Sequence, residues 1–212
     1  MTNLAEEARR LKPRRTARGR LLPRLILMTD SVRLPDPLSA IVRLPRGSAV
    51  ILRHYDDGAP DGTTREALAR RLLADCRRCG VLLLIAGDAQ LAAAIGADGL
   101  HLPEHQLRHG PRRWRLWRRP LWIVTAAAHG PAALCQARCA GADAALLSPV
   151  FPTASHPGAA TLGPLRFARL AGATPMPVYA LGGISGTAAR RLRGAQPAGF
   201  AGIGGLRQPA AS

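Results

Sequence analysis

Two glycine-rich segments near the carboxyl end of the sequence have the composition of a phosphate-binding site. They are Leu181-Gly182-Gly183-Ile184 and Gly202-Ile203-Gly204-Gly205, and both lie where short apolar runs end. Glycine lets backbone N–H groups approach an anion closely and tolerates a positive φ angle. The two segments therefore predict phosphate binding at Gly182, Gly183, Ile203 and Gly204, with ordinary turn glycines as the alternative.

His129 is the candidate for proton transfer, because it directly follows the small apolar residues Ala126, Ala127 and Ala128. Histidine titrates near neutral pH and serves as a general acid or base, although a lone histidine is more often structural. Other histidines also lie near the ends of apolar runs, namely His54, His101, His105 and His156. Three of them together would suit zinc, but nothing in the sequence shows that they converge.

Carboxylates at the same predicted strand ends raise the question of a metal. They are Asp30, Asp56, Asp57, Asp88 and Glu104. Magnesium binds carboxylates together with substrate phosphates. Asp88 also precedes a predicted helix, where an aspartate caps the free N–H groups, and we favour that role. The sequence therefore predicts no resident metal, with Asp88 as a weak candidate ligand.

Residue composition excludes several classes of chemistry. Lys12 is the only lysine and lies in a basic leader, which argues against Schiff-base and pyridoxal enzymes. No Gly-Lys-Ser/Thr phosphate loop is present. The cysteine pairs Cys76/Cys79 and Cys135/Cys139 fall in helical windows, and we interpret them as reduced thiols of a cytoplasmic protein, with a four-thiolate zinc site as the alternative.

The net charge of +17, from 30 basic and 13 acidic residues, invites comparison with nucleic-acid-binding proteins. The arginines are spread along the chain, however, and aromatic residues make up only 4% of it. Neither zinc-finger spacing nor an aromatic RNA-binding motif occurs. Nucleic acid is therefore not the expected partner, and no apolar run approaches the length of a membrane span.

Eight short apolar runs alternate with longer stretches rich in Ala, Leu and Arg. The runs are Leu25–Met28, Ala49–Leu52, Val81–Ile85, Gly99–Leu102, Leu121–Thr125, Ala144–Leu147, Pro177–Leu181 and Gly199–Ile203. Continuous apolar runs of this length are typical of parallel strands buried on both faces. The alternation predicts a small (β/α)₈ TIM barrel, with a doubly wound open sheet as the alternative. The catalytic residues of such a barrel lie at the carboxyl ends of its strands.

The predicted organisation is a basic, flexible leader over residues 1–20, with a short helix from Leu4 to Leu11, and a single barrel domain over residues 21–212. The eighth helix is absent or truncated, because Arg207–Ser212 is too short and contains Pro209. A missing helix exposes apolar barrel wall beside the last strand, and a homodimer would cover it.

Four segments in this order resemble the thiamine phosphate synthase/TenI family. They are Leu27-Met28-Thr29-Asp30, Gly96-Ala97-Asp98-Gly99-Leu100-His101-Leu102, Ser148-Pro149-Val150-Phe151-Pro152-Thr153 and Ala180-Leu181-Gly182-Gly183-Ile184. The resemblance covers about residues 24–206. It implies the same barrel and a pocket for a phosphorylated thiazole, in which Arg53 holds phosphate and Thr153, Ser155 and His156 contact substrate.

The chain departs from the family's synthases, which join a pyrimidine pyrophosphate to a thiazole phosphate on magnesium. The resemblance places Gly87 and Gln106 where those enzymes carry the two magnesium carboxylates, and neither side chain replaces a carboxylate. Tyr55 and His156 stand in place of family lysines, whereas Arg53 is kept. The magnesium-pyrophosphate half of the site is therefore lost, while the thiazole-phosphate half survives.

TenI-like thiazole tautomerases resemble this chain more closely in their site residues. They share the phosphate site, do not need the magnesium carboxylates and move a proton with a histidine at the position of His129. The resemblance therefore predicts a tautomerase without a cofactor. A diverged synthase, which would need Mg²⁺, and a non-catalytic ligand-binding relative are the alternatives.

Overall fold

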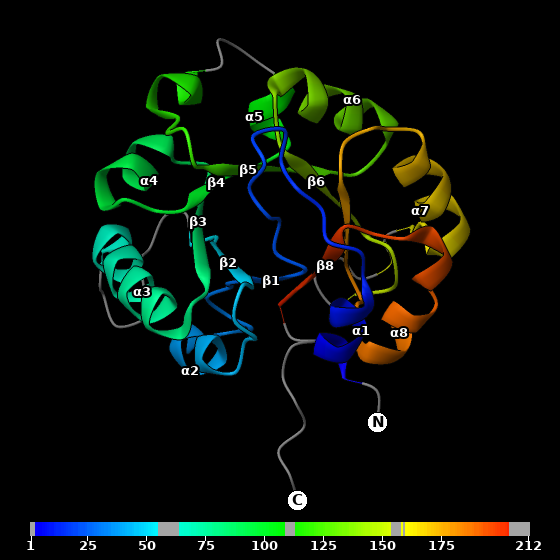
Figure 1. Cartoon of the computed structure of the whole chain (residues 1–212), viewed down its shortest axis with the longest axis horizontal. Coiled ribbons are helices and arrows are strands. Elements are labelled where there is room, and N and C mark those ends of the chain that lie inside the picture. The colour runs from blue at the N-terminus through cyan, green and yellow to red at the C-terminus, as the bar shows by residue number, and fades with distance from the viewer. Residues whose placement is uncertain (1–2, 55–63, 109–112, 154–157, 159, 204–212) are drawn as a thin grey trace, which may run out of the picture.

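The computed structural model describes residues 3–54, 64–108, 113–153, 158 and 160–203. Eight parallel strands form a closed barrel in which each strand pairs with its neighbours in the sequence and β1 also pairs with β8 (Figure 1). They are β1 (Leu25–Met28), β2 (Ala49–Leu52), β3 (Leu82–Ala86), β4 (Gly99–Leu102), β5 (Ile123–Ala128), β6 (Ala144–Leu147), β7 (Val178–Leu181) and β8 (Gly199–Gly202). The predicted TIM barrel is confirmed, and the open sheet is excluded because the barrel is closed.

Helices surround the barrel and connect its strands. They are α1 (Leu4–Arg10), α2 (Pro37–Val42), α3 (Arg65–Cys79), α4 (Ala89–Ile95), α5 (His105–Arg108), α6 (Pro131–Ala140), α7 (Gly163–Gly172) and α8 (Gly186–Arg190), with the 3₁₀ turns η1 (Arg113–Trp117) and η2 (Arg193–Ala195). Local signals set many of their ends. Thr64, Asp88 and Ser185 each accept a backbone N–H at a helix start, and Gly96 and Gly141 end α4 and α6 in the left-handed region.

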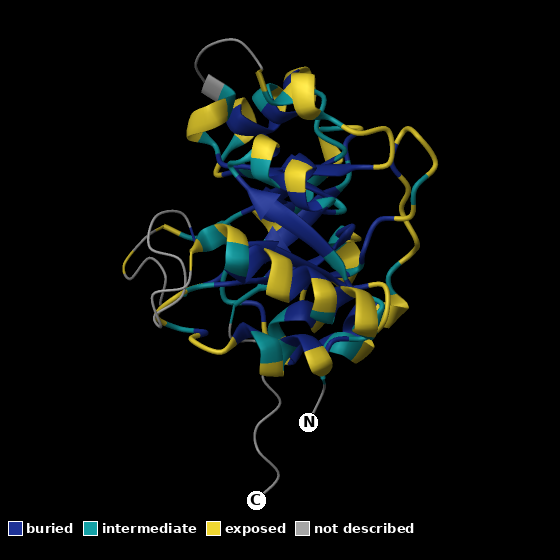
Figure 2. Ribbon diagram, turned by 90° about the vertical axis from the view of Figure 1, so that its left-hand side faces the viewer, coloured by how far each residue is buried: buried dark blue, intermediate teal, exposed yellow. Residues whose placement is uncertain are grey.

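The core has two layers, one inside the barrel and one between the strands and the helices. Alternate residues of a strand serve the two layers, as Ile26 and Leu27 of β1 do. Tyr179 fills the interior and donates a hydrogen bond to the Pro23 carbonyl oxygen at 2.6 Å. Figure 2 shows the result as buried strands beneath helices whose outer faces are exposed. The strands are therefore rigid supports for the residues at their ends.

The amino-terminal segment folds against the barrel. Its helix α1 contacts α8, and Leu4 and Ala8 are buried. A short antiparallel pairing of Arg15 with Leu21 then returns the chain to β1, and Arg20 donates hydrogen bonds to Asp98 before β4 and to the Leu121 carbonyl. The short helix expected at the start of the leader is thus present.

Phe200 of β8 is only 1% exposed. The exposed apolar wall expected beside β8 is therefore not found among the described residues, because α1 and α8 cover this side, and the structural argument for a homodimer is removed. The homodimer itself stays a prediction, and the predicted absence of a helix after β8 falls on residues 204–212, outside the described part of the chain.

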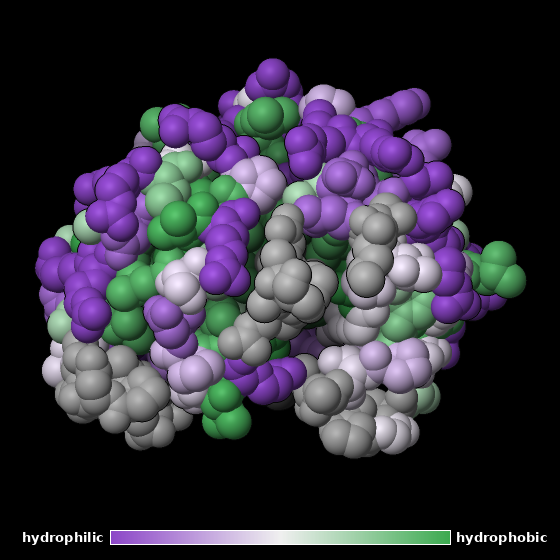
Figure 3. Space-filling model, turned by 90° about the horizontal axis from the view of Figure 1, so that it is seen from below, coloured by the Kyte–Doolittle hydropathy of each residue, from purple (hydrophilic) through white to green (hydrophobic). Residues whose placement is uncertain are grey.

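Much of the face in Figure 3 is hydrophilic, with apolar patches between the hydrophilic side chains. No helix in the described ranges is long and apolar enough to cross a membrane.

Candidate active site

A cavity of about 320 Å³ opens at the carboxyl ends of the strands. It lies at the end of the barrel where TIM-barrel enzymes carry their catalytic groups. It brings together residues from seven of the eight strands or the loops that follow them: Met28, Arg53, His101, Pro103, Glu104, His105, Ala127, His129, Ser148, Pro149, Thr153, Leu181, Gly182 and Ile203. The predicted residues Arg53, His129, Thr153, Gly182 and Ile203 therefore share one cavity. Gly183 directly follows Gly182 in the chain. Ser155, His156 and Gly204 fall outside the described residues.

His129 is held by Glu104. The Glu104 Oε2 atom lies 2.5 Å from His129 Nδ1 and accepts the His129 backbone N–H at 3.1 Å. The carboxylate is largely buried, with 12% of its side chain exposed, whereas 51% of the His129 side chain is exposed at the cavity. Because Glu104 Oε2 already accepts the amide hydrogen, we assign it as the acceptor of Nδ1–H as well. Within the described chain His129 Nε2 has no hydrogen-bond partner, so its lone pair is available to a substrate.

The pairing of Glu104 with His129 was missing from the sequence interpretation, which treated Glu104 only as a possible magnesium ligand. The two residues are 25 positions apart. They meet because β4 and β5 are neighbours in a register that sets Leu102 opposite Ala126, so that the loops after both strands begin at the same level. Aligning the predicted fourth and fifth strands as neighbours in a barrel would have predicted that Glu104 and His129 meet.

Two other histidines are buried and neutral rather than catalytic. The Nδ1 of His101 lies 2.9 Å from Thr125 Oγ1, and burial together with nearby Arg53 lowers the pKa of His101 to about 3. Thr29 Oγ1 accepts the Arg53 backbone N–H and forms a second hydrogen bond with His54 Nδ1, at 3.0 Å. Burial is the main cause that lowers the pKa of His54. No group of three metal-binding side chains occurs among the described residues, which gives the zinc alternative no support there.

Arg53 supplies a positive charge at the cavity. Its guanidinium NH2 lies 3.8 Å from Asp30 Oδ2, and about a third of its side chain is exposed. Asp30 is bound more tightly by Arg33, at 2.5 Å. The Arg33 hydrogen bond is the main cause that lowers the pKa of Asp30 to about 2. Asp30 therefore stays ionised and orients Arg53 without neutralising it, since its charge is already matched by Arg33.

The positions that the resemblance to the family assigns to magnesium ligands carry other contacts in this structure. The Gln106 side-chain amide donates to the Gly87 carbonyl oxygen at 2.9 Å. Asp88 Oδ1 accepts the Leu91 N–H at 2.8 Å, which makes it the cap of α4. Its other oxygen, Oδ2, faces the Arg65 guanidinium at 3.4 Å.

Arg65 also donates to the Ala86 carbonyl oxygen at 2.5 Å. A guanidinium therefore lies at the end of β3, and the donor set of this region does not fit a magnesium ion, which takes carboxylate and other oxygen ligands. The structure favours the helix-cap interpretation of Asp88.

The glycines after β7 are required by close packing. Gly182 and Gly183 have φ angles of +93° and +65°. A Cβ atom would lie 2.9 Å from Pro149 Cα at Gly182 and 2.4 Å from the Pro152 carbonyl oxygen at Gly183. Turn geometry thus explains part of the glycine pattern. Among described residues, the N–H groups of Gly183, Ile184 and Ile203 find no acceptor, and they remain as donors for an anion.

Comparison with known proteins identifies the family of the chain. A sequence model of the family described as thiamine monophosphate synthase matches residues 29–206. The thiamine-phosphate synthase of Salinispora arenicola is 31% identical over 193 residues, which cover 89% of this chain and 91% of that protein. The putative thiamine-phosphate synthase 2 of Aquifex aeolicus is 32% identical over 165 residues, 77% of this chain and 87% of that protein.

Other relatives match over a smaller part of their length. The thiamine-phosphate synthase of Thioalkalivibrio sulfidiphilus is 34% identical over 139 residues, so 66% of this chain matches 65% of that relative. Among solved structures, the thiamine phosphate pyrophosphorylase of Pyrococcus furiosus superposes with a TM-score of 0.69 at 25% identity, over 86% of this chain and 85% of the other. On the match to the family model, the identity to these relatives and the shared fold, the chain belongs to the thiamine monophosphate synthase family.

Proposed function

We propose that this protein binds a phosphorylated thiazole and catalyses a proton transfer on it, in the manner of the TenI-like tautomerases that its site residues resemble. The observation that carries the proposal is the His129–Glu104 pair at the cavity, with Nδ1 and Oε2 2.5 Å apart. A carboxylate on one ring nitrogen orients the imidazole and stabilises the imidazolium that forms when the other nitrogen takes a proton. No metal is needed for this step.

The proposed reaction moves one proton between two positions of the same molecule. His129 Nε2 removes a proton from the thiazole carboxylate phosphate, and the electron pair left behind shifts into the ring system. Glu104 stabilises the transient positive charge on His129. The imidazolium then returns the proton at the second position, so that the product is the aromatic tautomer and the enzyme is unchanged.

Phosphate binding anchors the substrate in this proposal. Arg53 provides a guanidinium that matches a phosphate bidentately, and the amides of Gly183, Ile184 and Ile203 provide backbone donors. Thr153 lines the cavity, consistent with the predicted substrate contact. The predicted roles of Ser155, His156 and Gly204 stay predictions. We also propose that the protein acts in the cytoplasm, which its membership of a biosynthetic family supports.

A thiamine phosphate synthase is the second candidate. The names of the relatives support it more directly than they support a tautomerase. Arg53 could bind a pyrophosphate, but the Gln106–Gly87 and Asp88–Arg65 contacts lie in the region where, by the resemblance, the family's synthases hold magnesium. A working synthase would therefore need carboxylates from elsewhere, such as Glu104.

One set of assays separates the candidates. Purified protein is incubated with thiazole carboxylate phosphate in EDTA, and the tautomer is followed by ultraviolet absorbance. A separate reaction with thiazole phosphate, pyrimidine pyrophosphate and Mg²⁺ is analysed for thiamine phosphate by chromatography. Tautomer conversion that is lost in His129→Ala supports our proposal. Mg²⁺-dependent thiamine phosphate formation would establish the synthase instead, and binding without either turnover would leave the non-catalytic relative.

A further inference from the structure

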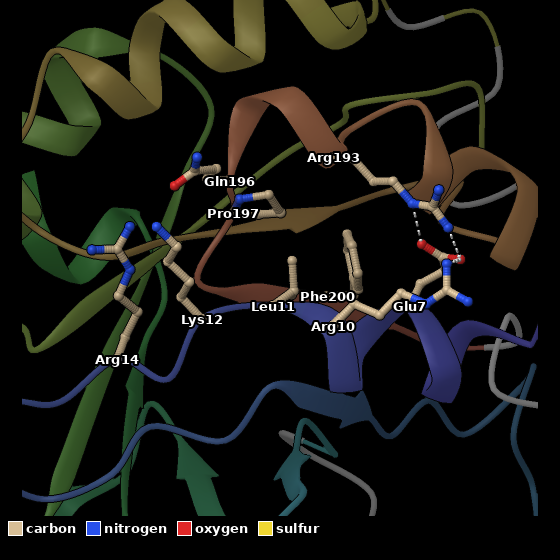
Figure 4. A pocket seen from close by; sticks show the side chains of 9 residues that line it. All are labelled: Glu7, Arg10, Leu11, Lys12, Arg14, Arg193, Gln196, Pro197 and Phe200. Carbon is tan, nitrogen blue, oxygen red and sulfur yellow. Dashed lines mark hydrogen bonds and ion pairs between the residues drawn. The ribbon is translucent and has the colours of Figure 1, made fainter.

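Figure 4 shows a second cavity, of about 360 Å³. Its lining residues precede β1 or lie before and at the start of β8, so it lies at the amino ends of these strands, opposite to the end that carries His129. One wall comes from α1 and the residues that follow it, including Leu11 and Lys12. The other comes from η2 and the start of β8, where Gln196 and Pro197 precede the strand. The amino-terminal segment therefore builds half of a cavity that the proposed function does not use.

The lining of this cavity is strongly positive. Arg10, Lys12, Arg14 and Arg193 line it together with a single carboxylate, Glu7. Glu7 is buried and accepts two hydrogen bonds from Arg193, at 2.6 and 2.8 Å, while Arg10 approaches it at 3.6 Å. The Arg193 hydrogen bond is the main cause that lowers the pKa of Glu7. The negative charge of Glu7 is therefore already neutralised.

Lys12 and Arg14 have no such partner. Neither side chain forms a hydrogen bond or ion pair with another residue in the described ranges. Both lie at the end of the cavity away from the Glu7–Arg193 pair (Figure 4). Two cations that share a cavity without an anion repel each other, and a bound anionic group would relieve that repulsion.

Apolar side chains lie between the two charged ends. Leu11, Pro197 and Phe200 occupy the middle of the cavity in Figure 4. Pro197 and Phe200 are buried and belong to the wall of the barrel, whereas Leu11 is partly exposed. Such a surface favours a flat apolar group rather than a fully hydrated ion.

Gln196 gives independent support, because its backbone is unusual. Its φ of +45° makes it the sole non-glycine with a positive φ among the described residues. It ends η2 and takes the left-handed conformation that Gly96 and Gly141 take at the ends of α4 and α6.

The side chain of Gln196 forms no hydrogen bond within the described structure and lines the cavity. An unfavourable backbone conformation of this kind is a recurrent mark of ligand sites. Here it leaves an amide beside Lys12 and Arg14 (Figure 4).

We propose that this cavity is a second binding site, for a small anion that carries a flat apolar group, such as an aromatic phosphate or carboxylate. The anionic group binds Lys12, Arg14 and the Gln196 amide, and the apolar group packs on the partly exposed Leu11, in the part of the cavity that the buried Phe200 lines. The site is separate from the cavity at His129, and its existence does not depend on the proposed reaction.

The only lysine of the chain makes the test specific to this site. Reductive methylation with ¹³C-formaldehyde places an NMR label on Lys12 and keeps its charge. The α-amino group is also labelled, and Lys12→Arg identifies its signal. The labelled full-length protein is titrated with phenyl phosphate, inorganic phosphate and phenol.

We expect a saturable shift of the Lys12 signal with phenyl phosphate, weaker binding of inorganic phosphate and no saturation with phenol. Arg14→Ala removes a charge-assisted hydrogen bond and weakens phenyl phosphate binding about tenfold. Gln196→Ala removes a neutral amide and no charge, so it weakens phenyl phosphate binding less. Arg166→Ala, on the exposed part of α7, is the charge-matched control and leaves the affinity unchanged.

The proposal is overturned if the Lys12 shift is linear in ligand, or if Arg14→Ala and Arg166→Ala bind equally well. Equal affinities for inorganic and phenyl phosphate would also overturn it, because the apolar group would then contribute nothing. Circular dichroism confirms that the variants are folded. A folded Arg14→Ala protein with unchanged affinity overturns the proposal. Phenyl phosphate that binds without moving the Lys12 signal also overturns it, because the ligand then binds elsewhere, such as in the cavity at His129.

Discussion

Replacing Glu104 by glutamine is the sharpest test of how His129 is prepared for proton transfer. The substitution keeps the size of the side chain and removes its charge. A hydrogen bond to a charged group contributes roughly 1.5–3 kcal/mol, and this one joins Glu104 Oε2 to His129 Nδ1 at 2.5 Å on a carboxylate that is 12% exposed. A loss of about 2 kcal/mol in the transition state corresponds to about a 30-fold fall in kcat.

The loss grows further if the glutamine amide donates to Nδ1 and thereby selects the wrong tautomer of His129, an effect that reaches about 10⁴-fold in a comparable carboxylate–histidine pair. We therefore expect kcat for tautomer conversion to fall at least about 30-fold, whereas KM changes little, because phosphate is held by Arg53 and backbone groups. Steady-state kinetics by ultraviolet absorbance measure both constants.

Glu66→Gln is the matched control, since Glu66 is exposed on α3 and pairs only with Arg70 among the described residues. Glu104→Asp restores a carboxylate and is expected to recover part of kcat. A folded Glu104→Gln protein with kcat within twofold of the original would refute the role assigned to Glu104. A rise in KM with unchanged kcat would show instead that Glu104 binds substrate.

Three further predictions concern stability and metal binding. Gly183→Ala is expected to destabilise the fold by more than about 1 kcal/mol, visible as a lower urea midpoint, because φ is +65° and the new Cβ would meet the Pro152 carbonyl oxygen at 2.4 Å; an unchanged midpoint would contradict the packing argument. EDTA and MgCl₂ are both expected to leave the melting temperature unchanged, because the Asp88 carboxylate already binds the Leu91 N–H and Arg65. A saturable, Mg²⁺-dependent rise of the melting temperature would show a metal site that the structure does not reveal. Asp30 has a folded-state pKa of about 2, below its unfolded value, so its contribution to stability is complete above about pH 4 and is lost as the pH falls toward 2. Allowing for the partly exposed Arg33, Asp30→Asn should lower the free energy of unfolding by about 1–2 kcal/mol at pH 7 and flatten the loss of stability between about pH 4 and pH 2. Parallel acid-unfolding curves for the two proteins would count against this prediction.

Much of the fold could be predicted because barrel strands are buried on both faces and their sequences are continuously apolar. The runs at Leu25–Met28 and Ala49–Leu52 coincide with β1 and β2. The predicted strand boundaries differ from the observed ones where apolar residues extend beyond the strand. The fifth run was expected at Leu121–Thr125, and β5 spans Ile123–Ala128, because pairing with β4 and β6 and not local composition decides where a strand ends.

Residue type alone was enough to nominate part of the candidate site. Histidine after β5 and glycines after β7 carry their chemistry in their own side chain or backbone, so position along the chain sufficed to propose His129, Gly182 and Gly183. The glycines could not be divided between turn and phosphate roles from sequence, because the contacts with Pro149 and Pro152 come from another loop.

Tertiary structure decided which charges meet. Glu104 reaches His129 across 25 positions, and Glu7 reaches Arg193 across 186. The first contact follows from the register of β4 and β5, and the second from the docking of α1 on α8, neither of which is set by local propensity. The sequence by itself thus determined the barrel, its family and the proton-transfer candidate. Only the closed barrel determined the partner of His129, the guanidinium of Arg65 at the end of β3 and the basic cavity beneath α1, because each depends on contacts between distant segments.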